Sequence, residues 1–246
     1  TMSKPLHPGK AAMNGLLAAL LAREGFTGSP AMLDGPGGLP ATFLGVTDLG
    51  AAVEDLGKRF EILENSTKPY AACHLTHATI DAARAIRVRE APAAAAVEAV
   101  SCRVHPLVLK VAANAAPRTG LEAKFSIAFC AAMALVRGEA GEAEFGDESL
   151  RDPAVARVMA RVTPEADASL GVGAARVTVR LADGRVLEER VTAARGMPER
   201  PLTREELEAK FSRLGEVVLP AERVARLAAA LRGLADLPDV AELATL

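Results

Sequence analysis

Residues 175–192 read ARVTVRLADGRVLEERVT and carry the clearest β-strand pattern of the chain. Apolar and polar residues alternate on both sides of Asp183 and Gly184, a pair favoured at the tip of type I′ hairpin turns. The pattern therefore predicts two antiparallel strands joined by a tight turn. Two further strands are expected, one over residues 95–104 and one beginning at Val162.

Helical patterns lie on both sides of these strands. Apolar residues recur at the spacing of amphipathic helices, which we expect over residues 9–24, 48–60, 77–89, 119–137, 152–160, 203–214 and 220–234. Residues 1–8 contain two prolines and are expected to be irregular. Gly25 is placed to end the first helix, and Thr203 and Glu206 have the spacing of a capping box. The order predicts an α+β fold, with an α+β block inserted into or appended to a helical body.

The composition is that of a soluble globular protein. Of the 246 residues, 50% are hydrophobic and 24% are charged, and the net charge is −2. That charge and the lack of a basic run give no support to nucleic-acid binding, and no apolar run is long enough for a membrane span. Three cysteines, an odd number, indicate reduced thiols rather than a disulfide framework, so we expect a cytoplasmic protein.

The densest group of chemically active residues lies in residues 68–87, KPYAACHLTHATIDAARAIR, which hold two of the four histidines and the single tyrosine. Thr76 has the identity and position of a helix N-cap. His77 then falls in the first turn, where free backbone N–H groups attract anions and disfavour a protonated imidazole. Asp81 and Arg84 follow on the same helix face. The alternative is an ordinary helix start with a solvated polar stripe.

Two other basic or metal-binding patterns are weaker. Cys73 and His77 have the spacing of a metal pair, but no second pair completes a zinc site, so no metal and no cofactor are expected. Residues 4–10, KPLHPGK, place Lys4 and His7 just before a helix. That arrangement would suit a carboxylate or phosphate, or be a solvated helix entrance.

Three blocks of the sequence resemble the MmgE/PrpD family. They are MSKPLHPGKAAMNGLLAALLAREGFTG at residues 2–28, TKPYAACHLTHATIDAA at residues 67–83 and AKFSIAFCAAMALVRG at residues 123–138. The resemblance runs through all 246 residues and covers only the C-terminal half of the family's length. This family includes 2-methylcitrate dehydratase, cis-aconitate decarboxylase and iminodisuccinate epimerase.

The resemblance implies a division into three parts. Residues 1–66 would end an all-helical domain, and residues 67–197 would form an α+β lid domain with a small antiparallel sheet. Residues 198–246 would be C-terminal helices that return to the helical domain. The active site would lie between the domains, and a homodimer is expected. The upstream helical half is an implied partner, either in the same precursor or as a separate chain.

The resemblance also assigns site residues. Lys4 and His77 inherit catalytic roles, as a carboxylate-binding cation and a proton-relay or polar contact. The expected substrate-binding residues are Lys68, His7, Ser126 and Phe129. Phe129 stands where several relatives have tyrosine, so a phenolic proton donor is missing, which disfavours decarboxylation.

These residues imply a cofactor-free lyase or isomerase that acts on a small di- or tricarboxylic acid. Dehydration of the 2-methylcitrate type, a step of propionate catabolism, is the expected reaction, and the upstream half is expected to be needed for activity. A second hypothesis is a non-catalytic subunit that binds carboxylates or completes another chain. A third is that Thr1 acts as an N-terminal nucleophile.

Overall fold

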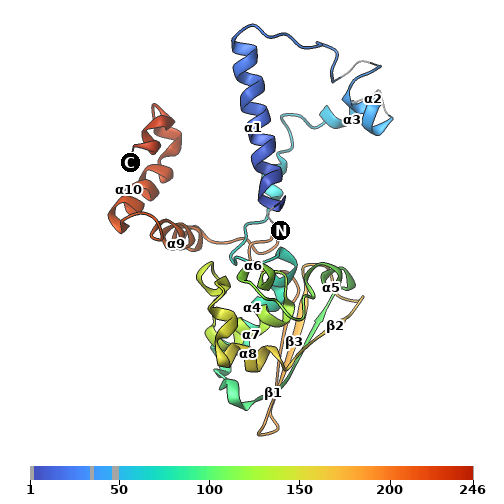
Figure 1. The fold of residues 1–246 in the computed structure, drawn as a ribbon, viewed down its shortest axis with the longest axis vertical. Coiled ribbons are helices and arrows are strands. Elements are labelled where there is room, and N and C mark those ends of the chain that lie inside the picture. Colours follow the sequence, from blue (N-terminus) through green and yellow to red (C-terminus); the bar gives the residue numbers. More distant parts are fainter. Residues whose placement is uncertain (1–2, 34–35, 46–49, 246) are drawn as a thin grey trace. The chain divides into compact units, whose positions relative to one another are not determined.

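The computed structural model describes residues 3–33, 36–45 and 50–245. The chain divides into two compact units, Thr1–Glu61 and Ile62–Leu246 (Figure 1). Thr1 lies outside the described residues, so the nucleophile hypothesis stays untested. The three-part domain division remains a prediction.

The first unit contains the helices α1 (Ser3–Arg23), α2 (Leu39–Leu44) and α3 (Gly50–Val53). The expectation of an irregular segment before residue 9 was wrong, because α1 begins at Ser3 and includes Pro8. Pro5 lies in the first turn, where the backbone N–H groups have no helical partner to lose.

The end of α1 confirms the role of Gly25. This glycine has a φ of 87°. Its N–H donates to the carbonyl of Ala22 (3.0 Å), and the N–H of Phe26 donates to the carbonyl of Leu21 (2.9 Å). This pair of bonds is the Schellman motif, which a left-handed glycine completes without steric strain.

The second unit contains one four-stranded sheet with the order β2-β1-β3-β4. Its strands are β1 (Val97–Val104), β2 (Val162–Ala166), β3 (Ala175–Leu181) and β4 (Val186–Val191). The β1–β3 and β3–β4 pairs are antiparallel, whereas β1 and β2 are parallel. The α+β fold is confirmed, with a mixed sheet in place of the expected purely antiparallel one.

Helices make up most of the rest of this unit. The α-helices are α4 (His77–Glu90), α5 (Pro106–Ala112), α6 (Gly120–Ala123), α7 (Ile127–Arg137), α8 (Pro153–Met159), α9 (Arg204–Gly215) and α10 (Ala221–Arg232). Short 3-10 helices are η1 (Glu61–Glu64), η2 (His74–Thr76), η3 (Ala94–Ala96), η4 (Ala143–Phe145), η5 (Ser149–Arg151), η6 (Leu234–Asp236) and η7 (Val240–Ala244).

The core lies between one face of the sheet and the helices α4, α7 and α8 (Figure 1). Alternate residues of β3, from Ala175 to Leu181, are buried, as the period of a half-buried strand requires. In α7 every residue from Ile127 to Leu135 is buried. A helix that is apolar on all sides belongs inside a fold, and its alanines allow α4 and α7 to approach closely.

The expected helix over residues 119–137 is broken into α6 and α7. Ser126 has extended backbone angles (φ −119°, ψ 108°), and its hydroxyl accepts a hydrogen bond from the N–H of Phe129 (3.2 Å). This serine is therefore the N-cap of α7. Serine competes with the helical backbone through such local bonds, which explains the break.

The tip of the expected hairpin is a three-residue loop rather than a type I′ turn. The N–H of Gly184 donates to the carbonyl of Leu181 (2.9 Å), and the N–H of Leu181 donates to the carbonyl of Arg185 (2.9 Å). Gly184 has a φ of 86°, but among the described residues Ala91 is the only non-glycine with positive φ. Asp183 thus lacks the conformation that a type I′ turn needs, and the loop is a type I turn with a glycine bulge.

The helix α9 begins with the expected capping box between Thr203 and Glu206. Three side-chain contacts attach α9 to the α+β part of the second unit, and one of them is the ion pair of Arg213 with Glu139 (3.6 Å). Glu206 forms an ion pair with Arg195, and the ammonium of Lys210 donates to the carbonyl of Lys68 (2.8 Å).

Two distant segments meet at Gly196, where we predict a strong effect of added volume. Gly196 has a φ of 84°, and a Cβ there would lie 1.8 Å from the carbonyl oxygen of Thr67. Gly196→Ala should therefore destabilise the second unit by about 3 kcal/mol or more, which lowers Tm by roughly 6–12 °C in thermal unfolding.

The matched control is Gly171→Ala, because nothing lies within 4 Å of a Cβ at that position. We expect its Tm to stay close to that of the unmodified chain. Equal effects of the two substitutions would contradict the close approach of Gly196 and Thr67.

Candidate functional site

Three rings gather at the start of α4. The His77 ring lies edge-on to Tyr70, with centroids 5.2 Å apart, and 4.9 Å from the ring of His74. His77 is fully buried, and neither of its ring nitrogens has a hydrogen-bond partner among the described residues. A buried polar group without a partner is rare in folded proteins and calls for an explanation.

Thr76 does not cap α4 with its side chain, so that part of the sequence prediction was wrong. The hydroxyl of Thr76 donates to the carbonyl of Cys73 (2.8 Å). Its backbone is helical (φ −92°, ψ −9°), because the 3-10 turn of η2 continues directly into α4. The position of His77 in the first turn of α4 is nevertheless confirmed.

Both histidines are held in the neutral form near neutral pH. Burial, followed by the nearby His74, lowers the pKa of His77 to about 3. The backbone of Ala72 opposes this shift in the pKa, but it makes no hydrogen bond of good geometry with either nitrogen. Burial and the positive charge of Lys68 also lower the pKa of His74. A neutral imidazole can accept a proton, which a protonated one cannot.

The predicted polar stripe of α4 is not solvated. Asp81 is buried, and its carboxylate accepts hydrogen bonds from the hydroxyl of Tyr70 (2.5 Å) and the backbone N–H of Arg195 (2.7 Å). Burial and then Asp81 raise the pKa of Tyr70, so the phenol remains a donor. Arg84 turns instead to the carbonyl of Gly138 (2.8 Å).

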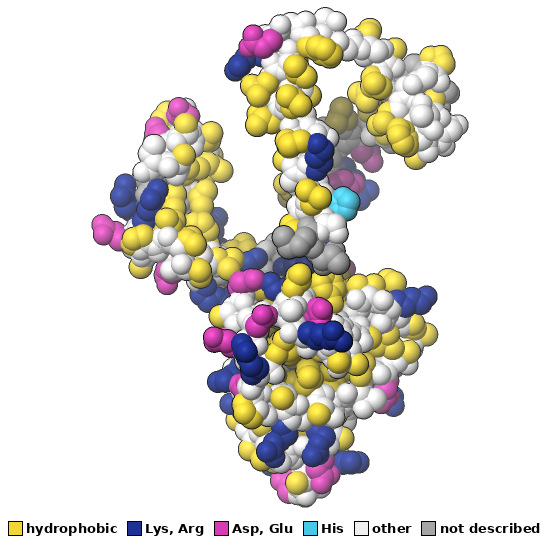
Figure 2. Space-filling model, in the orientation of Figure 1, with side chains coloured by type: hydrophobic (Ala, Val, Ile, Leu, Met, Phe, Trp, Pro, Cys, Tyr) yellow, Lys and Arg dark blue, Asp and Glu magenta, His cyan; other side chains and the backbone are white. Residues whose placement is uncertain are grey.

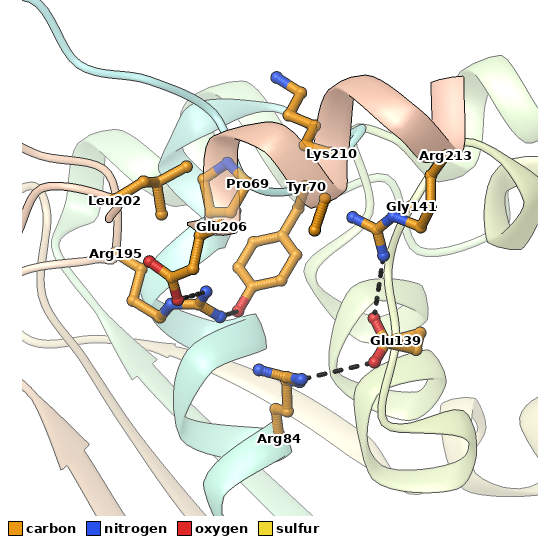
Figure 3. A pocket seen from close by; sticks show the side chains of 11 residues that line it. Pro69, Tyr70, Arg84, Glu139, Gly141, Arg195, Leu202, Glu206, Lys210 and Arg213 are labelled. Carbon is orange, nitrogen blue, oxygen red and sulfur yellow. Dashed lines mark hydrogen bonds and ion pairs between the residues drawn. The ribbon is translucent and has the colours of Figure 1, made fainter. Parts of the chain in front are cut away.

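Two adjoining cavities lie beside Tyr70 and α9. The larger, of about 720 Å³, is lined by Lys68, Tyr70 and Lys210 among others. The smaller, of about 210 Å³, includes Tyr70 and Arg195 in its lining (Figure 3). Neither His74 nor His77 is among the described residues that line these two cavities.

The structure brings together only some of the predicted site residues. Lys68 is exposed, donates to the carbonyl of Ala72 (3.2 Å) and lies near enough to both histidines to lower their pKa. Lys4 and His7 are exposed residues of α1, in the first unit. Their catalytic and substrate-binding roles remain predictions.

Ser126 and Phe129 are both fully buried in the core. The Ser126 hydroxyl caps α7, and the Phe129 ring packs against Phe145 with centroids 5.6 Å apart. Contact of either side chain with substrate remains a prediction.

Sequence reasoning missed His74, Tyr70 and Arg195. His74 is half-buried and three residues before His77, so the density of the segment was a signal for it. The sequence singled out Tyr70 only as the one tyrosine of the chain, whereas its hydroxyl donates to the buried Asp81. Arg195 follows Asp81 by 114 residues, and no local pattern indicates such a contact.

Comparison with protein families identifies the chain. The MmgE/PrpD C-terminal domain matches residues 70–236, and the MmgE/PrpD N-terminal domain matches residues 1–51. The chain belongs to the MmgE/PrpD family. The two matched domains fall on either side of the boundary between the two compact units, with the N-terminal match ending at residue 51.

Three curated MmgE/PrpD relatives align with the whole of this chain. Human cis-aconitate decarboxylase is 26% identical over 256 residues, and the mouse cis-aconitate decarboxylase is 26% identical over 258 residues. The cis-aconitate decarboxylase-like protein oryM of Aspergillus oryzae is 27% identical over 266 residues. The aligned regions are 53%, 52% and 55% of these proteins, so the chain spans about half the length of the curated relatives it matches.

Within the described residues, no group of three or more His, Cys, Asp or Glu side chains is arranged to hold a metal ion. No helix within the same ranges has the length and apolar content that a membrane span requires.

The buried neutral His77 predicts a pH dependence of stability. As the pH falls below about 6.5, the unfolded state takes up a proton at His77 and the folded state does not until about pH 3. Stability therefore falls with pH through this window. Acidification from about pH 7 to pH 4.5 should lower the free energy of unfolding by about 2 kcal/mol through His77 alone.

Denaturant unfolding of the full chain at the two pH values, compared with His77→Phe, measures this contribution. The variant should lose less stability on acidification than the unmodified chain does. His7→Phe, at an exposed position of α1, serves as the control and should leave the difference unchanged. Parallel pH profiles for His77→Phe and the unmodified chain would contradict the neutral, buried state of His77.

Proposed function

We propose that this chain supplies part of the active site of a cofactor-free hydro-lyase for a small di- or tricarboxylic acid, with 2-methylcitrate-type dehydration as the reaction. The observation that carries this proposal is the lysine-histidine group at the start of α4. Lys68 lies beside His74 and His77, whose pKa values are lowered by burial. A cation next to neutral imidazoles can hold a carboxylate and accept a proton in one place.

The chemistry needs both functions. A base removes the proton from the carbon alpha to a carboxylate, and the resulting negative charge spreads onto the carboxylate oxygens. Hydroxide leaves the neighbouring carbon, takes a proton to become water, and a carbon–carbon double bond forms. Lys68 would stabilise the developing charge and His74 would carry the proton, whereas His77, with a pKa of about 3, is a weak base and would supply a polar contact.

Dehydration is favoured over decarboxylation by Phe129. Loss of carbon dioxide leaves a carbanion that must be protonated at carbon, and the resemblance places a tyrosine in this position in several relatives. Phe129 has no hydroxyl and lies in the core against Phe145. The three relatives are named as cis-aconitate decarboxylases or as a protein like them, so both reactions belong in the assay.

The proposal includes an upstream helical half as a partner. No residue of α1 is buried, and apolar side chains run along it (Figure 2). Those at least 40% exposed are Leu6, Met13, Leu16, Leu17, Leu20 and Leu21. An apolar stripe of this length normally packs against other helices. The expected homodimer and cytoplasmic location remain predictions.

The alternative is a non-catalytic subunit that completes another chain, favoured by the same exposed stripe of α1. Turnover by the 246-residue chain alone would exclude it. Turnover only after addition of an upstream family half would support the shared active site. No turnover in either form, with citrate, 2-methylcitrate and cis-aconitate as substrates, would contradict the proposed reaction.

Substitution of Lys68 tests the site assignment in the complete assembly. Lys68→Met and His74→Gln should each lower kcat/KM by about a hundredfold or more, because each removes a group that meets developing charge or a proton. Lys110→Met, at an exposed position of α5, removes the same charge and should have little effect. Equal kcat/KM for Lys68→Met and Lys110→Met would show that Lys68 lies outside the site.

A further inference from the structure

The smaller cavity, of about 210 Å³, is lined mainly by charged side chains (Figure 3). Its wall comes from α4, the loop after α7, the segment that contains Arg195, and α9. Four cationic residues line it: Arg84, Arg195, Lys210 and Arg213. Two acidic residues, Glu139 and Glu206, also line it, so its charged lining has a surplus of two positive charges.

The ion pairs within the cavity do not use all four cations. Glu206 pairs with Arg195, and Glu139 is shared between Arg84 at 3.4 Å and Arg213 at 3.6 Å. The ammonium of Lys210 donates to the carbonyl of Lys68, and within the described residues no carboxylate lies within ion-pair distance of it. The charges that remain are therefore distributed over Lys210 and the two arginines that share Glu139.

Crowded cations of this kind repel one another unless an anion joins them. A guanidinium has five N–H donors. Arg84 uses its donors on the carbonyl of Gly138 and one oxygen of Glu139. Arg213 contacts the other oxygen, so several donors are left for another acceptor. Figure 3 shows Arg84 and Arg213 on opposite sides of Glu139, with the Tyr70 ring beside them. The arrangement has the donors for a small planar or tetrahedral anion.

We propose that this cavity binds a small dianion, a dicarboxylate or a phosphate, between α4 and α9. Two negative charges balance the surplus of the lining. The volume lies below the roughly 300–1,000 Å³ of sites for larger ligands, which limits the ligand to a few heavy atoms. His74 and His77 are not part of the lining, so the site is separate from the proposed proton-transfer group and does not depend on the proposed reaction.

Isothermal titration of the full chain in low-salt buffer tests this site. Succinate and inorganic phosphate are the two dianion probes, and acetate is the monoanion control. We expect saturable binding of at least one dianion, and the probe that binds more tightly identifies the source. Acetate should bind at least about tenfold more weakly, because it leaves one positive charge unbalanced.

Arg213→Gln and Lys210→Gln should each weaken dianion binding about tenfold. Arg223→Gln removes the same charge from an exposed position of α10 and should change binding by less than about twofold. Circular dichroism confirms that each variant is folded, and Lys210→Gln replaces Arg213→Gln if the latter unfolds. Absence of saturable binding, equal binding of acetate, or equal losses in Arg213→Gln and Arg223→Gln would overturn the proposal.

Discussion

The buried carboxylate of Asp81 holds the segments of the second unit that carry the candidate site. It accepts one hydrogen bond from the Tyr70 hydroxyl and one from the backbone of Arg195, and the guanidinium of Arg200 lies 3.6 Å away. Next to this contact, the N–H of Thr67 donates to the carbonyl of Gly196 (2.7 Å). The segment before α4 and the segment after β4 therefore lie side by side. The carboxylate of Asp81, on α4, binds both of them, through Tyr70 and Arg195. Loss of that acceptor would leave buried donors without partners, which is more costly than the bonds themselves.

The hydrogen bond between Tyr70 and Asp81 fixes the Tyr70 ring between the histidine group and the smaller cavity. Tyr70 presents its ring to His77, whereas its hydroxyl points to Asp81 and Arg195. The ring thus separates the buried histidines from the cavity beside α9. Arg195 extends the same network to Glu206, at the N-terminal turn of α9. Arg195 thus links the Tyr70 hydroxyl, at 3.5 Å, to the first turn of α9 through partly exposed side chains.

Local patterns in the sequence were sufficient for most elements, but not for contacts between them. The β3–β4 pair, the position of His77 and the capping box of α9 were predicted, because alternation and capping are read within a few residues. The parallel β1–β2 pair and the interior position of Asp81 depend on distant segments. An aspartate four residues after a first-turn histidine is indistinguishable from a solvated residue until Arg195 is placed beside it. The roles of Lys4 and His7 stay predictions for a related reason, since they lie in the other unit.

A double-mutant cycle between Tyr70 and Asp81 measures the contact on which this arrangement depends. Unfolding free energies of Tyr70→Phe, Asp81→Ala and the double variant would be obtained by denaturant titration of the full chain. The structure predicts a coupling energy of about 1.5 kcal/mol or more, as for a buried hydrogen bond to a charged group. Additive effects of the two substitutions would show that Tyr70 and Asp81 do not interact, and would contradict the arrangement of the site around them.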